Sequence, residues 1–307
     1  MKAIKEALKK NKPFMDTYIK FDRTINHMIF RISPVLHSKK IYKSVMGKRL
    51  NLDNPQNFNE KLQWLKLYWQ HPLISICADK YTVREYIEKC GQHEVLNDLF
   101  GVYNDSSEID FDDFPDQFVL KCTHGCGYNI ICTDKNSLDY NAIRKQLDQW
   151  MSERYSLYAG ELHYDKMKPR IICEKYLDDH SGLLPTDYKI YCFNGKAEFT
   201  MICTERTEKA RYDFYDNDWN KLLYDKENLV VSRTIEKPKN LARMIEAAEV
   251  LASPFPFVRM DFYNIDGKVI FGEMTFTPMG CLDTDLVEEA NNYLGTLIHL
   301  PNKYMMK

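Results

Sequence analysis

The sequence predicts an α+β protein with a mainly helical N-terminal part followed by a part rich in antiparallel strands. Two observations carry this prediction. Apolar residues recur at helical spacing in the segment 57–69, which begins with a helix-capping asparagine. Further along, the dipeptides Asn194-Gly195 and Asp266-Gly267 each separate two strand-like runs, which is typical of β-hairpins.

The remaining elements follow in chain order. Apolar spacing and capping residues predict helices at 57–69, 79–90, 140–150, 240–251 and 286–298. Strand-like runs are predicted at 117–121, 171–177, 186–203 and 257–277, the last three forming one mixed sheet. We expect a helical region at 1–110 with a basic start, and a second domain at 111–307. The second domain would divide into a subdomain at 117–170, which holds a glycine loop, and a catalytic, metal-binding subdomain at 171–307.

The hairpin at 257–278 is the most informative segment. A three-residue turn at 265–267 would pair Asn264 with Lys268 and place Arg259 opposite Glu273. One face would then carry Arg259, Asp261, Tyr263, Glu273, Thr275 and Thr277, with Val269 and Phe271 nearer the turn. The other face would carry Val258, Met260, Phe262, Ile270, Met274 and Phe276. Arginine, carboxylates and hydroxyls on rigid strands suit phosphate and Mg²⁺, which prefers oxygen ligands. A surface hairpin with a solvated polar face is the alternative that this segment alone leaves open.

A glycine-containing loop follows a strand that ends in Lys121. Gly125 and Gly127 would let the backbone approach a ligand closely and adopt positive φ. Backbone N–H groups in such a loop can bind phosphate, and the lysine would add a positive charge. The loop is neither a P-loop nor a Rossmann fingerprint, so an ordinary turn stays open as the alternative.

The same loop contains Cys122, His124 and Cys126, which could suggest zinc. Their spacing is tight, and no second pair stands at zinc-finger spacing, so we favour another use for the loop. The chain has nine cysteines without a regular framework, which predicts reduced thiols in a cytoplasm.

The motifs in their order along the chain resemble an enzyme family. A strand ending in lysine is followed by the glycine loop, a Glu-Lys-aromatic-Leu strand, an Asp-x-Lys strand and an Arg-Met-Asp…Gly-Glu-x-Thr hairpin. Further motifs are Asn57–Lys61, Ala78–Lys80, Asp187–Lys189, Phe193–Lys196, Asp218-Trp219 and Leu300-Pro301. Together they resemble the TupA-like ATP-grasp proteins of surface-polysaccharide and teichuronopeptide biosynthesis, from about Asn51 to Pro301. The hairpin and the Glu-Lys-aromatic-Leu strand are also similar to those of D-alanine–D-alanine ligases.

This resemblance implies an ATP-grasp fold, in which two α+β subdomains grip ATP, and it implies ATP and Mg²⁺ as cofactors. The implied nucleotide-binding residues are Lys121 at the phosphates, Gly125, Cys126 and Gly127 in a flexible lid, Glu174, Lys175, Tyr176 and Leu177 at the adenine, Asp187 at the ribose and Lys189 at a phosphate. The implied metal ligands are Asp261, Glu273 and Thr275, the last standing where the family usually has asparagine. Arg259, Lys189 and Lys121 are the implied catalytic residues.

The implied activity is that of an ATP-dependent carboxylate–amine ligase, which activates a carboxylate as an acyl-phosphate for attack by an amine. The family suggests a uronic acid or other acidic sugar as the acid, and an amino acid or amino-alcohol as the amine. Phosphoryl transfer depends mainly on positioning and charge neutralisation. Two alternatives stay open: a glycosyltransferase of capsule or O-antigen assembly, using the Asp-x-Asp of Asp283 and Asp285, and a catalytically silent ATP-grasp binding module.

Charge is unevenly distributed. Residues 1–50 contain thirteen Lys and Arg against three Asp and Glu, a net +10, so the other 257 residues sum to −12. A basic segment could contact an anionic membrane or a lipid-linked glycan, and a solvated helix is the alternative. We expect no nucleic-acid partner. Without a signal peptide or a run of ~20 apolar residues, the expected location is the cytoplasm, with the inner membrane face as a peripheral site.

Overall fold

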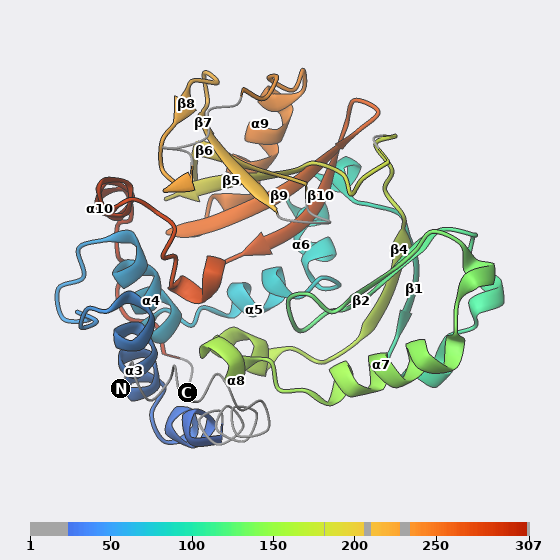
Figure 1. Ribbon diagram of the computed structural model, residues 1–307, viewed down its shortest axis with the longest axis horizontal. Helices are drawn as coiled ribbons and strands as arrows, with labels where there is room; N and C mark the ends of the chain where they lie inside the picture. Colours follow the sequence, from blue (N-terminus) through green and yellow to red (C-terminus); the bar gives the residue numbers. More distant parts are fainter. Residues whose placement is uncertain (1–23, 181, 206–209, 228–233, 306–307) are drawn as a thin grey trace, which may run out of the picture.

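The computed structural model describes residues 24–180, 182–205, 210–227 and 234–305. Two antiparallel sheets and a helical N-terminal part make up the molecule (Figure 1). The predicted α+β class with a helical N-terminal region is therefore confirmed. Among the described residues, no helix combines the length and the apolar character needed to cross a bilayer.

The larger sheet has the strand order β10-β9-β5-β6-β7-β8. Its strands are Asp187–Phe193 (β5), Lys196–Thr204 (β6), Arg211–Asp216 (β7), Lys221–Leu222 (β8), Phe257–Ile265 (β9) and Lys268–Thr275 (β10). The smaller sheet has the order β1-β4-β2-β3, with strands Leu99–Tyr103 (β1), Phe118–Cys122 (β2), Asn129–Cys132 (β3) and Ile171–Lys175 (β4).

The prediction of one mixed sheet is wrong, because β4 pairs with β1 and β2 rather than with the strands of the larger sheet. Ile171 and Cys173 of β4 are fully buried in the core of the smaller sheet, which fixes this placement. The domain boundaries stay a prediction, and the pairing of β1 and β4 favours a smaller-sheet unit of residues 99–175.

The helices are Pro34–Met46 (α3), Phe58–Tyr68 (α4), Pro72–Ala78 (α5), Val83–Lys89 (α6), Tyr140–Ser152 (α7), Ser156–Ala159 (α8), Leu241–Ala252 (α9) and Glu288–Leu297 (α10). The predicted Asn57 cap of α4 is confirmed, since its side chain accepts from the Glu60 N–H at 3.0 Å. α5 was not predicted, because seven residues show too little periodicity. α6 starts later than predicted, because Asp79 accepts from the N–H groups of Tyr81 and Thr82 in a turn before the helix.

Alternation along β5 and β9 gives the larger sheet two different faces. The even-numbered residues are buried in the core that includes α9, α5 and α6: Tyr188, Ile190, Cys192, Val258, Met260 and Phe262. On the opposite face, Tyr191, Phe193 and Phe257 are buried beneath α4 and α10. Further along this opposite face the odd positions become charged, at 187, 189, 259 and 261. The helices thus cover only the apolar end of this face.

The smaller sheet packs one face on α7, through Ile143 and Leu147 (Figure 1). Phe118 and Leu120 of β2 lie in this core. The alternate residues of β2 and β4 therefore point away from α7.

The turn of the β9–β10 hairpin differs from the prediction. It has two residues, Asp266 and Gly267, with φ of 51° and 77°, as a type I′ turn requires. As a result Lys268 pairs with Ile265, so the predicted pairing of Lys268 with Asn264 is wrong.

A β-bulge at Gly272 then shifts the register a second time. Beyond the bulge, Glu273 pairs with Asp261 and Thr275 pairs with Arg259, so the predicted pair of Arg259 and Glu273 is also wrong. Because the bulge compensates for the shorter turn, these four polar residues still share one face, as predicted. A bulge adds one residue to a single strand.

On the turn side of the bulge, three residues lie on the faces opposite to those predicted. Val269 and Phe271 are buried in the core with Phe262, whereas Ile270 pairs with Tyr263 on the polar face. The polar part of this face is therefore limited to the charged residues near the bulge and beyond it.

The N-terminal helices belong to the fold. Residues 24–32 and α3 are helical, and Phe30 and Tyr42 are each only 2% exposed. Seven of the thirteen basic residues of 1–50 fall in 1–23, outside the described residues.

Candidate active site

Three neighbouring strands bring the charged residues into adjoining rows. Across β10, β9 and β5, Glu273 stands beside Asp261, which stands beside Lys189. In the next row, Arg259 lies between Thr275 and Tyr191. Directly paired residues of antiparallel strands share a face, so the register alone brings Arg259 and Lys189 together with the three predicted metal ligands.

Arg259 contacts both carboxylates of the hairpin. Its Nε and Nη2 donate to the two oxygens of Asp261 at 2.7 and 2.6 Å, a bidentate arrangement. Nη2 also donates to Thr275 Oγ1 at 3.1 Å and lies 3.5 Å from Glu273 Oε1. Burial lowers the pKa of Arg259, but the charge and hydrogen bonds of Asp261, together with Tyr191 and Glu273, hold the pKa well above its usual value. The guanidinium is therefore charged.

Lys189 joins two acidic residues. Its Nζ donates to Asp261 and forms an ion pair with Asp187. Burial and, to a smaller extent, Arg259 lower the pKa of Lys189, but the carboxylates of Asp261, Asp187 and Glu273 together raise it above its usual value. The residues predicted at the ribose and at a phosphate thus belong to one ion-pair network.

Lys80 is a site residue that the sequence analysis did not select. Its Nζ donates to the carbonyl of Gly125 at 2.6 Å and lies 4.0 Å from Glu273 Oε2. The sequence feature that points to Lys80 is the motif Ala78–Lys80, which is part of the family resemblance but carries no assigned function there. Lys80 completes a balanced cluster of three cations and three carboxylates: Lys80, Lys189, Arg259, Asp187, Asp261 and Glu273.

The balance of charge decides the ionisation of Glu273. Burial raises the pKa of Glu273, whereas the charges of Lys80, then of Arg259 and Lys189, lower it. The Thr275 hydroxyl, which donates to Oε1 at 3.0 Å, lowers it as well. The net result is a pKa of about 2. Glu273 is therefore a carboxylate at neutral pH before any metal binds.

The glycine loop connects β2 and β3 beside this cluster. Gly127 has φ of 78°, as predicted, whereas Gly125 does not have a positive φ. Gly125 is required for space, since a Cβ there would lie 2.7 Å from the Tyr128 ring and 2.8 Å from the Tyr155 ring. Cys126, also predicted at the nucleotide, lines a cavity of about 340 Å³, the larger of two cavities near the charged residues.

Lys121 and Glu174 form an ion pair on the face of the smaller sheet that points away from α7. Lys121 Nζ donates to Glu174 Oε2 at 2.7 Å, and Arg84 Nη1 lies 3.6 Å from the other oxygen. Burial lowers the pKa of Lys121, but Glu174, together with Tyr263 and Glu273, raises it above its usual value. Glu174 thus neutralises cations, a role that the sequence analysis did not predict.

A cavity of about 90 Å³ lies next to this pair. Its wall combines Lys121 with residues of both sheets and of the segment that follows β4: Asn97, Val119, Asn129, Ile131, Lys175, Tyr176, Leu177, Leu184, Pro185 and Tyr263. The main chain of Lys175 is engaged by Asp98 and Asn97, at 3.0 and 2.9 Å. Tyr176 and Leu177, which follow the end of β4, line the same cavity.

The larger cavity, of about 340 Å³, opens on the charged cluster. Arg259, Lys189, Glu273 and Thr275 line it. Its other walls are aromatic and acidic: Tyr155, Tyr164, Tyr191, Tyr212, Phe214, Glu161, Asp225, Asp283 and Asp285. The Asp-x-Asp pair considered for glycosyl transfer therefore belongs to this cavity.

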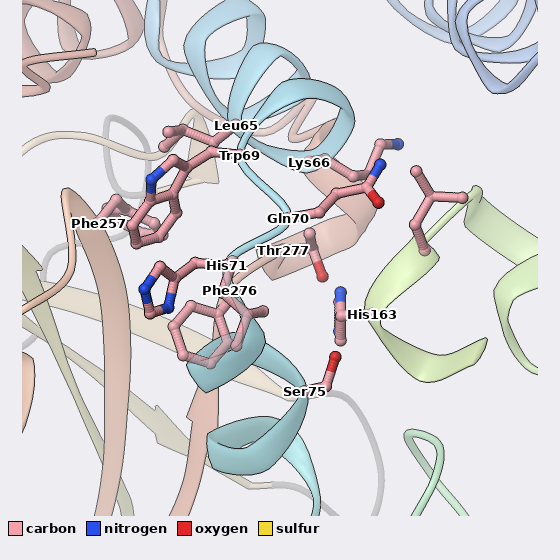
Figure 2. Close-up of a pocket in the computed structure, with 12 residues that line it drawn as sticks. Leu65, Lys66, Trp69, Gln70, His71, Ser75, His163, Phe257, Phe276 and Thr277 are labelled. Atoms are coloured by element: carbon pink, nitrogen blue, oxygen red, sulfur yellow. The ribbon is translucent and has the colours of Figure 1, made fainter. Parts of the chain in front are cut away.

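A third cavity, of about 30 Å³, shares Thr277 with the larger one. Figure 2 shows Thr277, His163 and Ser75 following one another along its wall. Burial, and then Lys66, lower the pKa of His163 to about 3, so its ring is neutral. The volume suits about one water molecule.

The family model of the TupA-like ATP-grasp proteins matches residues 60–299. The chain belongs to the TupA-like ATP-grasp family. The predictions of the family and of the fold are thus confirmed. No curated protein matches this ATP-grasp protein in sequence.

Several solved ATP-grasp structures are similar in fold. The D-alanine–D-alanine ligase from Bacillus anthracis complexed with ATP is 15% identical, with a TM-score of 0.38. The match covers 78% of this chain and 62% of that ligase. The D-alanine–D-alanine ligase from Helicobacter pylori is 14% identical (TM-score 0.39; 80% and 64% covered). The N5-carboxyaminoimidazole synthase from Aspergillus clavatus, in complex with ADP and 5-aminoimidazole ribonucleotide, is 11% identical (TM-score 0.41; 68% and 46% covered). At these values the likenesses say nothing about the substrates of this ATP-grasp protein.

The donor chemistry of the ATP-grasp site fits Mg²⁺. Asp261 and Glu273 provide two carboxylates on adjacent strands, and Mg²⁺ is usually held by one or two carboxylates together with phosphates. Among the described residues, no three His, Cys, Asp or Glu side chains form a complete metal site. Phosphate and water would therefore complete the shell. The Thr275 hydroxyl is already engaged by Arg259 and Glu273.

The three residues considered for zinc have separate surroundings in this ATP-grasp protein. Cys122 is buried in the core of the smaller sheet. His124 Nε2 lies 3.1 Å from the Trp150 carbonyl oxygen. Cys126 lines the larger cavity.

Proposed function

We propose that the protein is an ATP-dependent carboxylate–amine ligase that forms an amide bond. One observation carries the proposal: the register of β10, β9 and β5 unites two carboxylates, Asp261 and Glu273, with two cations, Lys189 and Arg259. Three of the four, Glu273, Lys189 and Arg259, line the larger cavity. Such a site can position and neutralise phosphates, which is the main requirement of phosphoryl transfer.

ATP would lie along the cavity next to Lys121 and the larger cavity. The cavity next to Lys121, with Val119, Ile131 and Tyr263 in its wall, suits the adenine ring. The main-chain groups of Tyr176 and Leu177 would form hydrogen bonds with the edge of the adenine, and Asp187 would lie near the ribose. Lys175, also predicted at the adenine, is the last residue of β4 and would contribute to the wall of this cavity. Lys121, Lys189 and the loop from Gly125 to Gly127 would contact the phosphates, with Lys80 behind the loop.

The acid substrate would meet the γ-phosphate next to Arg259. Asp261 and Glu273 would hold Mg²⁺, which when bound would neutralise the negative charge of the phosphate oxygens. Thr275, predicted as a third ligand, would position Glu273 by its hydrogen bond. Arg259 would stabilise the negative charge on the transferred group, because its guanidinium remains charged and lines the cavity.

The substrates belong to bacterial surface-polysaccharide assembly in this proposal. The acid would be a uronic acid or another acidic sugar, and the amine an amino acid or amino-alcohol. Support comes from the family match and from the aromatic wall of the larger cavity, since tyrosine rings give flat surfaces for packing a sugar.

The N-terminal helices would hold the protein at the inner membrane face or at a lipid-linked glycan, within the cytoplasm. Residues 24–50 contain six Lys and Arg and no Asp or Glu. Met28, Ile32 and Leu36 are 58%, 79% and 58% exposed on the same helices. Exposed apolar side chains beside basic ones favour anionic lipid surfaces.

The test is ADP release from Mg-ATP with a panel of uronic acids, each with and without amino acids or amino-alcohols. A ligase requires the acid, and its amide product requires the amine as well. Turnover of a sugar nucleotide without ATP would favour a glycosyltransferase. Binding of Mg-ATP without turnover by the whole panel would favour a silent module. An Arg259→Lys variant is the matched control, because it keeps one charge and removes the bidentate contact to Asp261.

A further inference from the structure

Glu161 is a buried carboxylate outside the nucleotide and metal site. It lies between α8 and the turn Leu162–Lys166, and it is only 7% exposed. Its side chain lines the larger cavity together with Glu273 and Arg259. A charged group is rarely buried unless it is paired, so its surroundings deserve a functional explanation.

One oxygen of Glu161 is held, and the other is open to a ligand. The Thr277 hydroxyl donates to Oε1, which ties the residue to the end of β10. No hydrogen bond to Oε2 occurs within the described residues. A carboxylate can accept about four hydrogen bonds, so a ligand with N–H groups can be accommodated.

The titratable groups around Glu161 come from several elements: Lys66 on α4, Glu273 on β10, Cys126 in the glycine loop, Tyr155, Tyr164 and Cys281. Lys66 is the one cation among these six, and its Nζ donates to the Ala159 carbonyl at 2.9 Å. Burial raises the pKa of Glu161, Thr277 and Lys66 lower it, and Glu273 raises it, with a net increase. Glu161 is therefore a better proton acceptor than an exposed glutamate.

Aromatic rings stand beside this carboxylate. Tyr155 and Tyr164 line the same cavity and pack edge to face, with ring centroids 4.8 Å apart. Aromatic faces attract cations, and the attraction is stronger where water is excluded. A carboxylate beside tyrosine rings is suited to an ammonium group.

We propose that Glu161, with Tyr155 and Tyr164, binds the amino group of the acceptor amine as an ammonium ion and removes its proton. This inference rests on the proposed ligase function. The Glu161 carboxylate takes one proton from the ammonium. The nitrogen lone pair then attacks the carbonyl carbon of the acyl-phosphate and forms the C–N bond. The C–O bond to phosphate breaks, and the leaving phosphate takes the bonding electrons and the second proton.

The test compares a protonated amine with hydroxylamine, which is already neutral near neutral pH. Both nucleophiles can capture an acyl-phosphate, the second as a hydroxamate. The probe acid is one that supports ADP release by the wild-type protein. For Glu161→Gln we expect the amide-forming rate with the amine to fall by about 10²–10⁴-fold, while hydroxamate formation stays within a few-fold of wild type. Glu249→Gln on α9, outside the cavity, is the control, and the thermal shift with Mg-ATP should be unchanged in both variants.

A pH profile adds a second measurement. In wild type, kcat/KM for the amine should be level between the pKa of Glu161 and that of the amine. In Glu161→Gln it should rise through this interval with unit slope, because only free amine reacts. If Glu161→Gln does not fold, the wild-type profile and that of Glu161→Asp decide the question, and a unit slope in wild type would overturn the proposal.

Two other results would also overturn the inference. An equal loss with amine and hydroxylamine would mean that Glu161 positions the site in general, and an unchanged rate with both would mean that it has no role in proton removal. A wild-type protein that releases no ADP and forms no hydroxamate with any acid would refute the ligase function itself, and this inference with it.

Discussion

Lys80 Nζ lies 4.0 Å from Glu273 Oε2 while it donates to the Gly125 carbonyl. This single side chain connects the glycine loop of the smaller sheet with the carboxylate expected to hold Mg²⁺. We therefore expect closure of the loop over a nucleotide to be coupled to the charge of the predicted metal site.

Lys80→Met should weaken Mg-ATP binding by about tenfold, because a charge-assisted hydrogen bond contributes roughly 1.5–3 kcal/mol. The glycine loop would lose its hydrogen bond to the segment between α5 and α6. Glu273 would lose the cation that lowers its pKa most. Calorimetric titration with Mg-ATP measures the effect. Lys89→Met, at an exposed pair with Glu85, is the control and should bind like wild type. Equal affinities of the two variants would contradict the coupling.

Glu273→Gln should abolish phosphoryl transfer and also reduce the stability of the free protein. Two neighbouring acids without a cation would raise each other's pKa, and Glu273→Gln would then leave the stability unchanged or higher. In the structure the neighbouring cations prevent this, since the pKa of Glu273 is lowered to about 2. A lowered pKa stabilises the fold above the usual value of 4.5, and this stability is lost as pH falls towards 2.

Urea unfolding at two pH values checks the stability of Glu273→Gln. After allowance for solvent screening, we expect a loss of roughly 1–2 kcal/mol at neutral pH. The difference from wild type should shrink towards pH 3. A variant as stable as wild type at neutral pH would show that the cations do not stabilise Glu273, and near wild-type turnover would place the metal elsewhere.

Thr275→Asn should retain activity, whereas Thr275→Val should lose most of it. Asparagine can both donate to Glu273 and accept from Arg259, as the threonine hydroxyl does at 3.0 and 3.1 Å. Valine has a similar shape but leaves Glu273 without this hydrogen bond. The measurement is the Mg²⁺ concentration for half-maximal ADP release, which should rise about tenfold for valine and stay equal or fall for asparagine. Similar values in both variants would exclude a role for the side-chain hydrogen bond.

Gly125→Ala and Gly127→Ala should fail for different reasons. At Gly127 the cost is backbone strain of roughly 1–2 kcal/mol, since φ is 78° and a Cβ would meet nothing within 4 Å. At Gly125 a Cβ would displace Tyr128 and Tyr155. We therefore expect both variants to melt earlier, and only Gly125→Ala to change the KM for the amine markedly, because Tyr155 lines the larger cavity. Parallel changes in KM would contradict this separation.

Charge reversal on α3 tests the membrane contact. Lys39→Glu combined with Lys43→Glu should weaken binding to vesicles containing anionic lipid, and the loss should diminish at high salt. Truncation through residue 45 would remove the buried Phe30 and Tyr42, so substitution is the cleaner change. Lys145→Glu, exposed on α7, is the control. If the wild type and the double variant bind the vesicles equally at low salt, the basic helices do not contact the membrane and are simply solvated.

Local patterns in the sequence determined much of the fold. The cap at Asn57, the turn at Asn194-Gly195 and the alternation along 257–263 depend on neighbours within a few residues, so each could be read directly. The clustering of Arg259 with Asp261 follows from the same alternation, because residues two apart on a strand share a face.

Only the tertiary structure decided which strands and side chains meet. The pairing of β4 with β2, the bulge at Gly272 and the place of Lys80 depend on contacts between residues far apart in the chain. Glu161 shows this best: its partner Thr277 lies 116 residues away. Sequence spacing carries no information on such a contact, since the packing of the two sheets and their helices determines it.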